Sequence, residues 1–171
     1  MTKVEVHEFG TYWSAWRVFD REALAAAPTE RGVYQVKVGE TGEIVYVGMA
    51  GDRHGQGLRG RLNAYFSGKA IASGFGEAIF DRALASSAFL RARLSEIERG
   101  APLPAKAWGR MALSDAETFE GGKLFVRWTP PENGVHPCDN PRALEAALES
   151  RARADGIKLW NKDTGGRSRS A

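Results

Sequence analysis

The chain of 171 residues is 43% hydrophobic and 26% charged, which is the composition of one ordinary globular domain and excludes a disordered or fibrous chain. Twenty-four Lys and Arg against 21 Asp and Glu leave a net charge of +3, too small to indicate a nucleic-acid partner by itself. The single cysteine, Cys138, excludes an intramolecular disulfide and a thiolate-bound metal centre. Because no signal core and no run of about 18 apolar residues occurs, we expect a cytoplasmic protein without membrane contact.

The first half of the chain predicts a helix, a hairpin and a second helix. A short helix is expected from Asp20 to Ala27, before Pro28. Residues 32–38 and 43–48 are rich in β-branched and aromatic side chains and flank a loop with two glycines, which predicts a β-hairpin. Residues 57–66 predict the next helix.

The second half predicts a long helix, a third strand and a final helix. Apolar side chains at three-to-four spacing predict one helix over 77–99, ended by Gly100 and Pro102. Residues 123–128 predict a strand, and the last helix is expected from Asn140 to Gly156. The fold class is therefore α+β, a small three-stranded antiparallel-type sheet flanked by helices in one domain over residues 1–163. Residues 164–171 are expected to form a flexible basic tail.

Four polar side chains on these elements, three tyrosines and one arginine, are candidates for a binding site. Tyr34 lies in a Gly-x-Tyr on the first hairpin strand and Tyr46 in a Tyr-x-Gly on the second, although strand propensity alone also explains tyrosines there. Arg61 and Tyr65 are four residues apart on the next helix and share one face. A guanidinium fork beside phenols suits an oxygen-rich anion such as a phosphate.

These residues resemble the GIY-YIG nuclease family. Gly32-Val33-Tyr34 and Tyr46-Val47-Gly48 match its signature pair, and residues 57–66 are similar to the Arg-containing helix in the nuclease domain of bacterial excision-repair endonucleases. Glu149 followed twelve residues later by Asn161 is similar to the family's metal-ligand Glu and closing Asn. The matched motifs bracket residues 32–161, and the resemblance implies core segments 32–66 and 123–161 with a helical insertion over about 68–122.

The resemblance implies a divalent-metal-dependent DNA endonuclease that hydrolyses phosphodiester bonds. Such hydrolysis needs a metal, a cation for the phosphate and a proton acceptor for water. Glu149 would anchor Mg²⁺, with Mn²⁺ as a substitute, and Arg61 would hold the phosphate. Tyr34 is the expected base with Tyr46 as the alternative, and Tyr65 would hydrogen-bond the scissile phosphate. The expected supporting residues are Gly48, Glu145 and Asn161.

The final helix offers a second carboxylate. Glu145 lies four residues before Glu149, so either side chain could face the hairpin tyrosines. Because Glu149 keeps the spacing to Asn161, it is the predicted ligand, and Glu145 is predicted to be a supporting or structural carboxylate.

Basic residues gather in two segments that together could face DNA. The predicted nucleic-acid contacts are Arg53, Arg59, Arg61, Lys69, Arg151 and Arg153. In the insertion, Arg82, Arg91 and Arg93 are expected to contribute DNA or homodimer contacts, and the alternative is a purely structural cover for the sheet.

Three readings of the function stay open. A restriction-type or mobile-element nuclease is favoured over a structure-selective repair nuclease because the chain is short and carries the insertion. A non-catalytic nucleic-acid binding module is the third, because Met49 stands where the excision-repair relatives have a Lys; Arg53 or His54 would have to replace that charge. The tryptophans are expected to be core or edge side chains, and His136 with Cys138 is expected to have no metal role.

Overall fold

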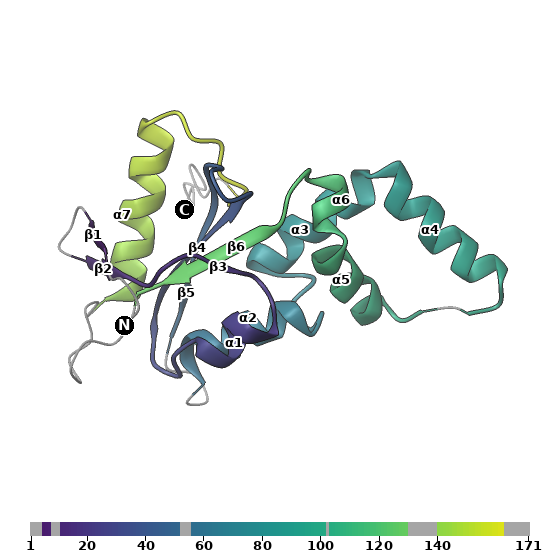
Figure 1. The fold of residues 1–171 in the computed structure, drawn as a ribbon, viewed down its shortest axis with the longest axis horizontal. Helices are drawn as coiled ribbons and strands as arrows, with labels where there is room; N and C mark the ends of the chain where they lie inside the picture. Colours follow the sequence, from purple (N-terminus) through teal and green to yellow (C-terminus); the bar gives the residue numbers. More distant parts are fainter. Residues whose placement is uncertain (1–4, 8–10, 52–55, 102, 130–139, 163–171) are drawn as a thin grey trace, which may run out of the picture.

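The computed structural model describes residues 5–7, 11–51, 56–101, 103–129 and 140–162. Within these ranges the chain forms six strands and seven helices, and the fold class is α+β, as expected from the sequence (Figure 1). None of the helices in these ranges has the length and apolar run that a membrane crossing requires. The expectations for Arg53, His54, His136, Cys138 and the tail lie outside the described residues.

The central sheet has four antiparallel strands, not the three predicted. Their order is β3 (Arg17–Val18), β6 (Leu124–Trp128), β4 (Gly32–Val38) and β5 (Ile44–Ala50). The unpredicted strand, β3, is only two residues long, so it carries no alternation that a sequence could show. A separate two-stranded ribbon of β1 (Glu5–His7) and β2 (Thr11–Trp13) was also not predicted.

The register of the predicted hairpin places both its tyrosines on one face of the sheet. Tyr34 pairs with Gly48 and Val36 pairs with Tyr46, and paired residues point to the same side. This face packs on α1 (Arg21–Ala26), α2 (Gly57–Phe66) and α3 (Gly74–Ala85) to form the main core.

The opposite face of the sheet is covered by α7 (Pro141–Ala154) and by Trp13. Val33 and Val47, which alternate with the two tyrosines, form a second buried cluster with Trp13. Leu144 and Leu148 of α7 pack against that cluster. The sheet is thus the middle layer, and α7 lies across it from α1 and α2 (Figure 1).

In the insertion, two consecutive helices replace the single helix that the sequence predicted over 77–99. The chain breaks at Ser86, whose backbone is extended and whose hydroxyl caps the second helix by accepting from Phe89 N at 3.3 Å. The two helices are α3 and α4 (Ser87–Glu98), followed by α5 (Ala105–Ser114) and α6 (Ala116–Phe119). Phe75 and Ile79 bind α3 to the main core, whereas α4 extends away from the sheet (Figure 1).

Candidate active site

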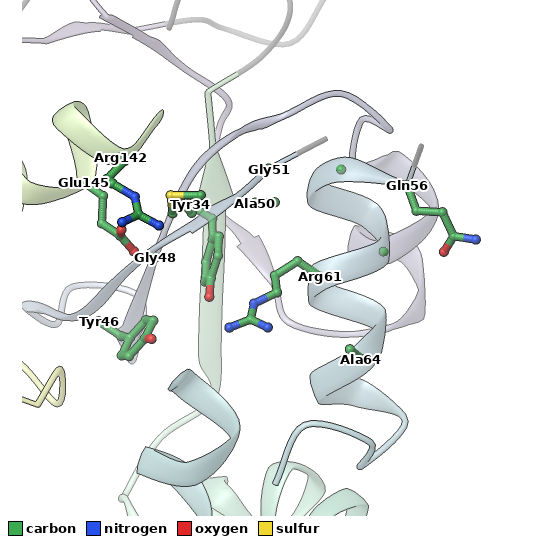
Figure 2. A pocket seen from close by; sticks show the side chains of 13 residues that line it. Tyr34, Tyr46, Gly48, Ala50, Gly51, Gln56, Arg61, Ala64, Arg142 and Glu145 are labelled. Atoms are coloured by element: carbon green, nitrogen blue, oxygen red, sulfur yellow. The ribbon is translucent and has the colours of Figure 1, made fainter. Parts of the chain in front are cut away.

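A cleft of about 540 Å³ opens between the hairpin, α2 and α7. The hairpin contributes Tyr34 and Tyr46, α2 contributes Arg61, and α7 contributes Arg142 and Glu145. Figure 2 shows Arg61 reaching from α2 toward Tyr34, with the two α7 side chains on the other wall. Residues that are far apart in the sequence therefore meet in one cavity.

Three phenols pack together beside this cleft, and two of them, Tyr34 and Tyr46, line it. The hydroxyls of Tyr34 and Tyr65 are 2.8 Å apart and share a hydrogen bond. The ring centroids of Tyr34 and Tyr46 are 6.1 Å apart, and those of Tyr34 and Tyr65 are 6.2 Å apart. Their exposed fractions are 0% for Tyr34, 6% for Tyr46 and 3% for Tyr65. The sequence-predicted group of tyrosines is thus brought together.

Burial keeps these phenols protonated. It raises the pKa of Tyr34 well above its ordinary value, and the neighbouring Tyr65 and Tyr46 raise it further. Burial also raises the pKa of Tyr46 and of Tyr65, while the charge of Arg61 opposes each of these shifts. At neutral pH the phenols are therefore donors, and a role as base requires more positive charge beside them.

Arg61 is a fixed cation on the wall of the cleft. Its guanidinium lies 4.9 Å from the centroid of the Tyr65 ring. Burial alone would lower the pKa of Arg61, but the neighbouring Tyr65 and Tyr34 outweigh it and the pKa is raised. Its buried Nε has no hydrogen-bond partner among the described residues. A charged donor held in this way is suited to an oxyanion.

At two positions beside the phenols only a glycine fits, because a larger residue would overlap the tyrosine side chains. A Cβ on Gly48 would lie 2.3 Å from the Tyr34 hydroxyl oxygen and 2.8 Å from Tyr46 Cε1, which explains the glycine in the second motif. Gly74, which the sequence reasoning missed, begins α3 at a φ of +55°, and a Cβ there would lie 2.9 Å from Arg61 Nη2 and 2.9 Å from the Tyr65 hydroxyl oxygen. The signal that could have found it is the glycine pair around Phe75, directly before a helical pattern.

Asn161 connects Glu149 to the hairpin through hydrogen bonds. Its Nδ2 donates to Glu149 Oε1 at 2.8 Å and to the Val47 carbonyl at 2.6 Å, and Val47 N donates to its Oδ1 at 3.1 Å. Arg153 Nη1 donates to the other carboxylate oxygen of Glu149 at 3.0 Å. Arg153, predicted to contact DNA, is thus engaged by this carboxylate.

The two α7 carboxylates occupy adjoining hollows. Glu145 lines the main cleft, whereas Glu149 lines a neighbouring hollow of about 350 Å³ with Gly74. Tyr46 and Glu145 border both spaces. Burial and, after it, the charge of Glu149 raise the pKa of Glu145 to about 6. In the described part of the chain no three His, Cys, Asp or Glu side chains form a metal-binding group, so a metal here would rest on these two carboxylates.

Most of the other predicted DNA contacts lie away from the cleft. Arg59 Nε donates to the Ala27 carbonyl at 2.8 Å and its side chain borders a different hollow. Arg151 pairs with Asp155 at 2.9 Å, and Lys69 is exposed after the end of α2. Arg142 was missed, although its place one helical turn before Glu145 is a usable signal.

Of the three arginines expected to form a charged face, Arg82 and Arg93 are engaged by other groups of the chain. Arg82 lies 3.9 Å over the Trp160 ring and 3.3 Å from Glu120. Arg93 is buried and lies 3.1 Å from Glu96 and 3.6 Å from Asp115. Arg91 alone of the three is exposed.

Searches with protein-family models, curated proteins and solved structures find no match to the chain. What the site does is therefore inferred from its own groups. Arg61, Tyr34 and Tyr46 line the same cleft, and N–H and O–H donors of this kind suit an oxyanion.

Proposed function

We propose that the protein is a divalent-metal-dependent DNA endonuclease of the restriction or mobile-element type. The observation that carries the proposal is the convergence of Arg61, Tyr34 and Tyr46 at one cleft, with Tyr65 hydrogen-bonded to Tyr34 and packed against Arg61. These are the residues through which the sequence resembles the GIY-YIG nucleases. Both the relationship to these nucleases and the choice of a phosphodiester as substrate are parts of the proposal.

Arg61 and the phenols have different roles in the hydrolysis of the scissile phosphodiester. The Arg61 fork binds the non-bridging oxygens, where negative charge grows as water attacks. Tyr34, once ionised, accepts the proton of the attacking water, and Tyr65 donates its one O–H proton to the Tyr34 oxygen and so orients it for that transfer.

The carboxylates of α7 fit a hard divalent cation. Mg²⁺ takes one or two carboxylates and keeps most of its water, so the pair Glu149 and Glu145 suffices. Glu149 would be the ligand and Glu145 the neighbouring carboxylate. When bound, Mg²⁺ would neutralise charge on the phosphate and make both water and a nearby phenol more acidic. This agrees with the raised phenol pKa values, which call for added positive charge.

A non-catalytic DNA-binding module is the second candidate. Met49 lines the cleft where the excision-repair relatives carry a Lys, and Arg153 already neutralises Glu149. Both features weaken the positive field at the phenols and the hold on a metal.

Plasmid cleavage separates these functions. Supercoiled DNA is incubated with the protein in Mg²⁺, in Mn²⁺ and in a chelator, and strand scission is expected with either metal only. Tyr34→Phe and Arg61→Ala should each slow cleavage by roughly 10²- to 10⁴-fold, and Arg61→Lys should also fail because a point charge cannot replace the fork. The matched controls, Tyr12→Phe and Arg99→Ala, lie outside the cleft and should cleave normally.

The products identify the kind of nuclease. Discrete linear fragments support site-specific cleavage, and cutting of forks or flaps alone would indicate a repair nuclease. DNA binding without scission in both metals would overturn the nuclease proposal in favour of the module.

A further inference from the structure

Helix α4 carries an apolar stripe that its own chain does not cover. Leu90, Leu94 and Ile97 are 41%, 53% and 48% exposed. Their spacing of four and then three residues places them along one side of the helix. It is also the spacing at which helices pair through apolar side chains.

This stripe borders a groove and lies beside the face that α4 already buries. Phe89 packs in a small core with Ala83 and Ala112, which fixes the inner face of the helix. Trp108 of α5 joins the stripe to line a groove of about 320 Å³. Helix α4 extends away from the sheet (Figure 1), and Leu90, Leu94 and Ile97, which line the groove, are exposed. Contiguous exposed apolar surface of this kind marks an interaction site.

The charges beside the stripe favour a second copy of the same helix. Arg91 and Glu98 are both exposed and flank the stripe on one side, three residues before and four residues after Leu94. When two such helices meet antiparallel about Leu94, Arg91 of each copy faces Glu98 of the other. The contact occurs twice, since a two-fold axis repeats every pair.

We propose that the protein forms a homodimer through antiparallel pairing of α4, with the stripe of each copy seated in the groove of the other. In this arrangement the leucines and Ile97 make an apolar seam, and the two Arg91–Glu98 pairs set its direction. The proposal does not depend on the proposed nuclease activity.

Sedimentation of the full chain over a concentration series tests the dimer. Wild-type protein should be dimeric toward about 100 μM and dissociate on dilution. Leu94→Glu should raise the dissociation constant by about 100-fold or more, because the leucine is lost from both copies. Ala92→Glu adds the same charge at an exposed position on the far side of α4 and should leave the dimer unchanged. Circular dichroism of both variants checks that the fold is kept.

Charge reversal tests the antiparallel direction. Arg91→Glu and Glu98→Arg should each weaken the dimer, since like charges then meet twice, and the double variant should restore it. A wild-type chain that stays monomeric through the concentration series would overturn the proposal, as would a Leu94→Glu variant that dimerises normally. A double variant without rescue would overturn the antiparallel pairing and leave the groove to a different partner.

Discussion

The side chain of Glu149 is held by hydrogen bonds from two sides, whereas Glu145 faces the cleft with less support. Asn161 fixes one Glu149 oxygen relative to the hairpin, and such outer partners orient metal ligands. We expect Glu149→Gln to lower Mg²⁺-dependent cleavage by roughly 10²-fold or more and Glu145→Gln by about tenfold or less. Cleavage rates over a Mg²⁺ titration measure both. The reverse order would place the metal at Glu145, inside the main cleft.

The raised pKa of Glu145 makes a prediction for stability. Its pKa moves from 4.5 to about 6 on folding, so the folded state binds more protons between these values and stability falls as pH rises through that window. The ceiling is about 2 kcal/mol, and partial exposure reduces it to about 1 kcal/mol.

Glu145→Gln removes this penalty. In the presence of a chelator, the difference in free energy of unfolding between Glu145→Gln and wild type should shift by about 1 kcal/mol in favour of the variant from pH 4.5 to pH 7. Urea unfolding at each pH measures this difference. A difference that does not change with pH would mean that the carboxyl is well solvated.

At the scale of elements, the hairpin functions as a platform for the Tyr34 ring only if strand β5 has no side chain at Gly48. A Cβ at Gly48 would lie 2.3 Å from the Tyr34 hydroxyl oxygen, and this clash cannot be relieved without moving a fully buried ring. We expect Gly48→Ala to destabilise the protein by about 1–3 kcal/mol in urea unfolding. Gly51→Ala is the matched control, because among the described residues a Cβ there meets only Met49 Cε at 3.8 Å, and the variant should stay within about 0.5 kcal/mol of wild type. Equal stability of the two variants would contradict this packing.

The sequence predicted those elements whose signals are local. Alternation identifies β4 and β5, and the Asn140 cap followed by Pro141 identifies the start of α7, where Asn140 Oδ1 accepts from Ala143 N at 3.1 Å. The break between α3 and α4 was not predicted, because Ser87 continues the helical spacing of the sequence. The hydrogen bond by which the Ser86 hydroxyl caps α4 is seen only in the folded structure.

The residues of the candidate site also divide into those with a local sequence signal and those placed by tertiary packing. Tyr34, Tyr46 and Arg61 stand in motifs that can be recognised along the chain, whereas Gly74 and Arg142 enter the site from the first turns of helices whose docking depends on tertiary packing. Arg93 was misjudged for this reason also, since its partner Asp115 lies in the turn between α5 and α6, distant from Arg93 in the sequence.

For the whole molecule, the proposed nuclease activity and the proposed dimer together predict how a duplex would be cut. Because one cleft has one Arg61, a monomeric nuclease would hydrolyse one phosphodiester in each event, nick a plasmid and have to rebind to cut the other strand. Two chains joined through α4 bring two clefts to the same DNA molecule, and both strands can be cut in one encounter. Wild-type protein above its dimer dissociation constant should therefore form linear plasmid early in the time course.

Leu94→Glu separates the two clefts without altering either, because Leu94 lies on α4 and lines neither hollow at Glu145. It should keep the nicking rate and accumulate open circles before any linear product, whereas Ala92→Glu should behave as wild type. Gel analysis of nicked and linear plasmid at matched protein concentrations measures the ratio. A Leu94→Glu variant that is monomeric and still gives linear product at the wild-type ratio would show that a single chain cuts both strands, since the loss of pairing would then have no effect on the second cut.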